Sequence, residues 1–100
     1  MDPIELIRPF LDEDGRLTAF PSKRKKKIAA LFYLSGFFAP DTVYSEKEVN
    51  ELLKLHHTFS DPATLRRELY DYGFLDRTRD GKEYTLGAAP PSPEELGLLK

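Results

Sequence analysis

The chain has 100 residues, of which 40% are hydrophobic and 12% aromatic, so it contains enough apolar side chains for one small core and is not expected to be disordered. It contains no cysteine, which excludes disulfides and cysteine-based zinc sites and favours a reducing cytoplasm. The formal net charge of -2 argues mildly against a dedicated nucleic-acid binder, because such proteins are usually basic.

The N-terminal segment does not have the basic region followed by an apolar stretch that typifies a signal peptide. The longest apolar-rich stretch, residues 28–39, is too short to span a bilayer, so we expect a cytoplasmic protein. Apolar residues at helical spacing predict a first helix over residues 3–11. Residues 16–20 alternate between polar and apolar side chains, which predicts a short strand that Pro21 ends.

A second helix is predicted over residues 22–38. Its C-terminal two-thirds is almost entirely apolar, and a helix that is apolar on most sides is buried among its neighbours. Residues 42–44 are predicted to be an extended link. Ser45, followed three residues later by Glu48, forms a capping box that begins a third helix over residues 46–56.

Asp61 and Pro62 predict the start of a fourth helix, because aspartate is a favourable cap and proline fits the first helical turn. This helix extends to about residue 72 and is ended by the glycine that follows. A strand is then predicted to begin at residues 74–75. The dipeptide Asp80-Gly81 is typical of a hairpin turn, and residues 82–86 are predicted to form the second strand of the hairpin.

The order of these elements is typical of a winged helix-turn-helix. We therefore predict an α+β fold, mainly α, with about four helices and a C-terminal β-hairpin wing. This domain is predicted over residues 1–86, and the proline-rich segment 87–100 is predicted to be an extended tail.

Three segments carry a resemblance to a known family: FPSKRKKK at residues 20–27, YSEKEVN at residues 44–50 and ATLRRELYDYG at residues 63–73. Over roughly residues 10–86 the chain resembles the bacterial domain of unknown function two thousand and eighty-seven. In that family the domain occurs alone or behind a helix-turn-helix regulator of the arsenic-repressor type. The resemblance implies a transcription-related context and no particular mechanism.

A cluster of five bases begins the second helix, where the helix dipole is already positive. Each base placed there lowers the stability of the helix by about 0.3–1 kcal/mol at low salt, so helix stability gives no reason for the cluster. Free amides and bases at a helix start attract phosphate, which favours contact with nucleic acid. A solvated basic face paired with the acidic residues 12–14 is the alternative. The cluster consists of Lys23, Arg24, Lys25, Lys26 and Lys27.

The fourth helix and the hairpin tip carry the other candidate contacts. With Leu65 and Leu69 facing inward, the outward side chains suited to a DNA groove are Thr64, Arg66, Arg67 and Tyr70. The hairpin adds three bases suited to backbone phosphates, which are Arg77, Arg79 and Lys82. Residues 61–83 contain five bases and six acids, so ion pairing within the protein is the open alternative for these arginines.

No pattern indicates catalysis: the sequence shows no nucleophile with a base, no paired carboxylates in an apolar setting and no glycine-rich phosphate loop. Adjacent side chains on a helix point about 100° apart, so we interpret His56 and His57 as helix-end residues rather than metal ligands. We predict that the protein is not an enzyme and has no metal or cofactor.

The sequence favours a DNA-binding winged-helix protein of transcription regulation, with double-stranded DNA as its partner. A winged-helix module for protein interaction or dimerisation, or a binder of structured RNA, is the alternative. No membrane partner is expected. The DNA-binding hypothesis requires that the basic cluster, the fourth helix and the hairpin share one face of the folded chain.

Overall fold

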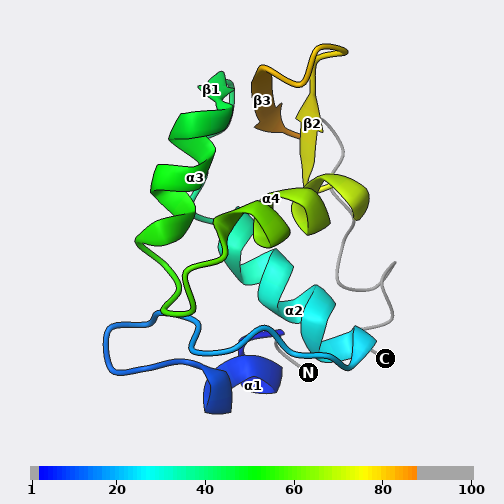
Figure 1. Ribbon diagram of the computed structural model, residues 1–100. Helices are drawn as coiled ribbons and strands as arrows, with labels where there is room; N and C mark the ends of the chain where they lie inside the picture. The colour runs from blue at the N-terminus through cyan, green and yellow to red at the C-terminus, as the bar shows by residue number, and fades with distance from the viewer. Residues whose placement is uncertain (1–2, 88–100) are drawn as a thin grey trace.

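The computed structural model describes residues 3–87, which are mainly helical with a small sheet at one end (Figure 1). The helices are α1 (Pro3–Ile7), α2 (Arg24–Ser35), α3 (Glu46–Lys54) and α4 (Pro62–Asp71), with a 3-10 turn η1 (Arg8–Phe10) after α1. The strands are β1 (Tyr44–Ser45), β2 (Leu75–Arg77) and β3 (Glu83–Leu86). Within the described residues, every helix is too short or too polar to span a bilayer. The predicted tail lies outside them, except for Gly87.

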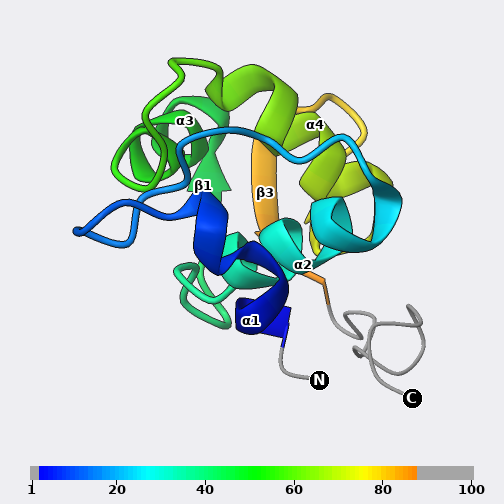
Figure 2. The same ribbon diagram turned by 90° about the horizontal axis from the view of Figure 1, so that it is seen from below.

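Helix α2 forms the centre of the hydrophobic core. Its fully buried residues are Ile28, Ala29, Ala30, Leu31 and Leu34. Both α1 and α4 pack against it, and Figure 2 shows α1 and α4 on different sides of this helix. The prediction of a buried central helix is therefore confirmed.

The three strands form an antiparallel sheet in the order β1-β3-β2. Strands β2 and β3 are the predicted hairpin, in which Arg77 lies opposite Tyr84. Strand β1, expected as an extended link, pairs with the other side of β3 and places Tyr44 opposite the same Tyr84. A strand between α2 and α3 and a hairpin after α4 give the α+β, winged-helix-like arrangement that the sequence predicts.

The predicted caps of α3 and α4 are present. The Ser45 hydroxyl accepts a hydrogen bond from the Glu48 amide, and the Glu48 carboxylate accepts one from the Ser45 amide. The Ser45 amide, with the Ser45 hydroxyl, lowers the pKa of the Glu48 carboxyl. At the start of α4 the Asp61 carboxylate accepts from the Thr64 amide, with Pro62 in the first turn.

One strand and several element boundaries were predicted incorrectly. The second helix begins at Arg24 rather than at residue 22, and the third ends at Lys54 rather than at residue 56. The first helix ends at Ile7 and continues only as the turn η1, because Pro9 has no amide hydrogen to donate to an α-helix. The second helix ends at Ser35, three residues early, in turns around Gly36. Residues 16–20 form no strand: Leu17 alone makes isolated bridges, to Leu11 and to His57.

The His57 side chain forms hydrogen bonds on both sides of the turn between α3 and α4. Its side chain is only 5% exposed. Its Nε2 accepts a hydrogen bond from the Asp61 amide at 3.0 Å, so the ring hydrogen lies on Nδ1, which donates to the Leu53 carbonyl at 2.6 Å. One imidazole therefore joins the end of α3 to the residue that caps α4.

Replacing His57 with alanine tests this role. The His57→Ala variant leaves a cavity and an unpaired amide and carbonyl, so we expect it to lower the free energy of unfolding by about 2–4 kcal/mol in a urea titration. Thr58→Ala is the matched control, because Thr58 is exposed and, among residues 3–87, forms a hydrogen bond through its backbone amide only. Equal stability of the two variants would show that the imidazole does not hold the turn.

Candidate nucleic-acid interface

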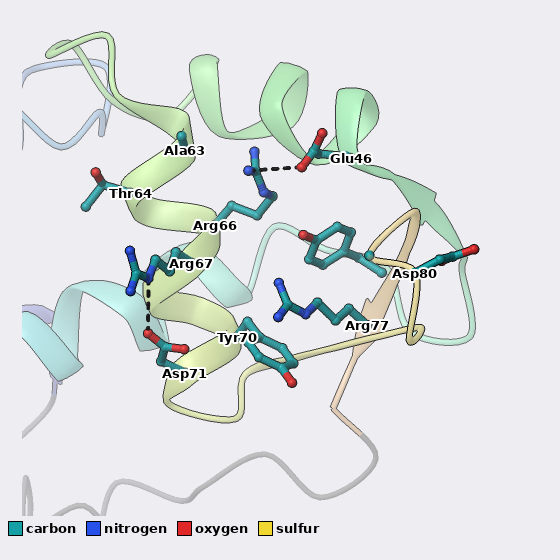
Figure 3. A pocket seen from close by; sticks show the side chains of 11 residues that line it. Glu46, Ala63, Thr64, Arg66, Arg67, Tyr70, Asp71, Arg77 and Asp80 are labelled. Carbon is teal, nitrogen blue, oxygen red and sulfur yellow. Dashed lines mark ion pairs between the residues drawn. The ribbon is translucent and has the colours of Figure 1, made fainter.

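A groove of about 560 Å³ lies between α4 and the hairpin formed by β2 and β3 (Figure 3). The predicted contact residues that line it are Thr64, Arg66, Arg67, Tyr70 and Arg77. The other lining residues are Glu46, Ala63, Asp71, Asp80, Gly81 and Tyr84. The groove thus brings together the exposed side of the fourth helix and one of the three predicted hairpin bases.

The orientation of α4 follows from its two fully buried leucines, Leu65 and Leu69. Because residues four apart share one face of a helix, burying this pair turns Thr64 and Arg67 outward. Both of these side chains are exposed. Tyr70 is 36% exposed at the edge of the same face.

Arg66 differs from its neighbour because it is held by α3. Its side chain is 17% exposed, and its guanidinium lies 3.1 Å from the Glu46 carboxylate. It also donates a hydrogen bond to the side-chain oxygen of Asn50. These two bonds fix α4 against α3 and direct Arg66 toward the protein rather than into free solvent.

Arg67 is the most accessible cation of α4. Its side chain is 83% exposed, and its partner Asp71 is 3.8 Å away, one turn along the same helix. An exposed pair at this distance is weak, because water screens it. Arg67 can therefore leave Asp71 for an anionic or hydrogen-bonding ligand at little cost.

Tyr70 and Arg77 join α4 to the hairpin. The Arg77 guanidinium carbon lies 4.1 Å from the centre of the Tyr70 ring, which is a cation–π contact. Hydrogen bonding with Tyr84, and to a smaller extent with Tyr70, raises the pKa of Arg77 above its ordinary value. Arg77 is exposed and permanently charged, and its contacts hold one wall of the groove in place.

The hairpin tip is a folded turn with two cations on its surface. The Asp80 carboxylate accepts from the Thr78 hydroxyl at 2.6 Å and from the Lys82 amide at 2.9 Å. The Thr78 hydroxyl is also the main cause of the lowered pKa of Asp80. Arg79 and Lys82 are exposed, and neither has an ion-pair partner among residues 3–87.

The five-base cluster is split between exposed and engaged side chains. Lys23, Arg24 and Lys25 are exposed and form no ion pair within the described part of the chain. Lys26 and Lys27 lie over the rings of Phe10 and Phe20, at 5.8 and 5.6 Å.

One member of this cluster forms an ion pair with a residue of α4. Lys27 lies 3.7 Å from the Glu68 carboxylate, and each of the two side chains is 25% exposed. Two of the three acids suggested as alternative partners, Asp12 and Asp14, pair with Arg16 instead. In Figure 1 the N-terminal turn of α2 lies below α4 and the hairpin lies above it, and Figure 2 also shows this turn beside α4.

The groove itself has no net formal charge. Three arginines line it, together with three carboxylates, from Glu46, Asp71 and Asp80. From the sequence, Glu68, Asp71 or a neighbouring helix were the possible partners of the two α4 arginines. Glu46 as the partner of Arg66, and Lys27 as the partner of Glu68, were not identified, because these pairings depend on how separate helices pack. The pairing of Arg67 with Asp71 has a local signal, the spacing of four residues on one helix.

Both histidine rings have partners inside the protein. The His56 ring stacks on Phe37 with the ring centres 3.6 Å apart, and burial lowers the pKa of His56. His57 makes the two hydrogen bonds described above. Residues 3–87 contain no group of three or more histidine, aspartate or glutamate side chains placed to hold a metal ion.

One comparison with known proteins identifies a family. The model of the family DUF2087, described as an uncharacterized protein conserved in bacteria, matches residues 16–86. The match includes α2 and every later element, and therefore the whole groove. No curated protein and no solved structure matches the chain significantly.

The adjacent arginines of α4 give a direct test of this geometry. Arg66→Ala removes a largely buried guanidinium and leaves Glu46 and Asn50 without it, so we expect the free energy of unfolding to fall by about 1–3 kcal/mol. Arg67→Ala removes an exposed side chain and should leave thermal and urea unfolding unchanged. A larger loss for Arg67→Ala would contradict the assignment of Arg66 as the structural arginine.

Proposed function

Given that the chain belongs to the DUF2087 family of uncharacterised bacterial proteins, we propose that it binds double-stranded DNA and acts in transcription regulation. The binding surface of this proposal consists of α4, the β2–β3 hairpin and the first turn of α2. In a winged helix the recognition helix enters the major groove while flanking elements contact the backbone. Helix α4 and the hairpin follow each other in the same order along this chain, which supports assigning them these two roles in the proposal.

One observation carries the proposal: the exposed face of α4 and the hairpin line a single groove, while exposed cations without an ion-pair partner among residues 3–87 lie at the hairpin tip and in the first turn of α2. The bases on the hairpin side are Arg79 and Lys82. Those on the other side are Lys23, Arg24 and Lys25. Cations at the edges of a docking surface suit the two phosphate backbones that border a DNA groove.

Base contacts are proposed for Thr64 and Arg67. Arginine can donate two hydrogen bonds to guanine, and threonine can contact a base or a phosphate. Arg66 and Arg77 have a different part in the proposal. They hold α3 and the hairpin in fixed positions around α4, so the groove is formed before the DNA arrives.

Because the groove has no net charge, the salt dependence of binding distinguishes a DNA ligand from a protein ligand. A protein partner docked there would exchange ion pairs with Arg67 and Asp71, with little net release of counterions. DNA releases counterions at each phosphate contact, so the logarithm of its binding constant falls by about 0.9 per contact for each tenfold rise in salt. A steep salt dependence therefore supports DNA, and a nearly flat one favours the protein-interaction alternative.

Charge reversal at the start of α2 tests the phosphate contacts. In fluorescence anisotropy with a labelled duplex of mixed sequence, we expect Lys23→Glu/Lys25→Glu to weaken binding at least tenfold and to flatten the salt dependence. Arg8→Glu/Lys47→Glu is the matched control, with the same charge change at exposed positions outside the proposed surface. Equal losses in the two double variants would remove the α2 cluster from the proposal, and a wild-type chain that binds no duplex would refute it.

Arg67→Ala tests base recognition separately. After selection of a preferred duplex from a random pool, we expect this variant to lose about 1–3 kcal/mol of discrimination at one base pair and to keep its affinity for unrelated DNA. Lys82→Ala, which removes a proposed phosphate contact, should weaken both kinds of duplex equally. An unchanged preference in Arg67→Ala would show that α4 does not read the base through this side chain.

A further inference from the structure

A carboxylate, Asp71, lies beside the arginine proposed to read a base. Steps of about 100° per residue bring positions 64, 67 and 71 within about 60° of one another on the helix. Figure 3 shows Thr64, Arg67 and Asp71 along one side of α4, with Arg66 and Tyr70 on its other side. All three side chains of this stripe are exposed, and all three line the groove. A ligand that contacts Arg67 therefore also meets the charge of Asp71.

The contact between the two side chains involves the inner edge of the guanidinium. The Arg67 Nε lies 3.8 Å from the Asp71 Oδ2. Arg67 has no other ion-pair partner among residues 3–87. Guanine presents two acceptors in the major groove, O6 and N7, which suit two donors of one arginine. Because the carboxylate lies on the Nε side, the two terminal nitrogens of Arg67 are available for such a pair of acceptors.

The stability of α4 gives no reason for a carboxylate at position 71. Asp71 is the last residue of the helix, where the helix dipole is negative and an acid is unfavourable. An ion pair between residues four apart is also weaker when the acid lies on the C-terminal side, as it does here. Both side chains are more than half exposed, so water screens the pair. A neutral side chain at this position would serve the fold at least as well.

A bound duplex would change the effect of this carboxylate. A duplex that covers the exposed side of α4 displaces the water that screens the pair, so the attraction between Asp71 and Arg67 becomes stronger. The carboxylate also repels phosphates, and it therefore opposes binding modes in which Arg67 contacts the DNA backbone. A contact of Arg67 with a base edge keeps the phosphates farther away. The charge of Asp71 thus favours base contact over backbone contact.

We propose that Asp71 is a positioning residue through which Arg67 selects guanine. Asp71 holds the Nε side of the guanidinium, and the two terminal nitrogens donate to O6 and N7 of one guanine. Its negative charge lowers the affinity of the same surface for unrelated DNA. This inference rests on the proposed function and extends it: the preferred duplex contains a guanine where α4 contacts it, and Asp71 contributes selectivity rather than affinity.

Asp71→Asn, which keeps the shape of the side chain and removes its charge, tests the proposal in the full chain. Fluorescence anisotropy compares the selected duplex, the same duplex with the contacted guanine replaced by adenine, and unrelated DNA. We expect the preference for guanine to fall at least about fivefold, and unrelated DNA to bind about two- to tenfold tighter at low salt. Asp41→Asn is the matched control and should bind as the wild type does, because Asp41 is exposed, lies outside the groove and has no ion-pair partner among residues 3–87.

A double-mutant cycle shows whether Asp71 acts through Arg67. In the Arg67→Ala background, Asp71→Asn should change the guanine preference no further, because the side chain that it positions is absent. An undiminished guanine preference in Asp71→Asn, when Arg67→Ala has lost it, would overturn this inference and leave the proposed function intact. A further loss of preference in the double variant would also overturn it. A wild-type chain that binds no duplex would instead refute both.

Discussion

The burial of Leu65 and Leu69 against the core is the constraint on which the candidate site depends. These two side chains fix the rotation of α4 about its axis, and that rotation decides which residues the helix presents to solvent. Contacts on two sides then fix its position: Arg66 with Glu46 of α3, and Lys27 of α2 with Glu68. The hairpin closes the groove through the contact of Arg77 with Tyr70.

Most of the cations around α4 therefore fall into two groups, and the exposed Arg67, weakly paired with Asp71, lies between them. Arg66, Lys27 and Arg77 hold elements of the fold together and are engaged with side chains of the protein. The exposed bases at the start of α2 and at the hairpin tip have no ion-pair partner within the described residues; they are Lys23, Arg24, Lys25, Arg79 and Lys82. This division reconciles an acidic protein with a proposed anion-binding surface, because local distribution matters more to a ligand than net charge.

Features encoded by nearby residues could be predicted from the sequence. The capping box of Ser45 and Glu48 and the hairpin around Gly81 depend on residues a few positions apart. Strand β1 could not be predicted, because it exists through pairing with β3, forty residues later along the chain. Pairing of Arg66 within the protein was an open alternative from the sequence, but its partner Glu46 could not be identified, since that contact depends on how α3 crosses α4. In residues 16–20 an alternating pattern predicted a strand that the structure does not contain. No neighbouring strand lies beside them, so Leu17 forms only isolated bridges.

The central claim is that DNA contacts α4, the hairpin and the start of α2 together. The most direct measurement is an amide chemical-shift map of the labelled chain, recorded while an unlabelled duplex is added. The account predicts shifts concentrated at residues 23–25, along the exposed side of α4 and at residues 77–82, with α1 unaffected. Shifts confined to one of these three regions, or centred on α3, would contradict it.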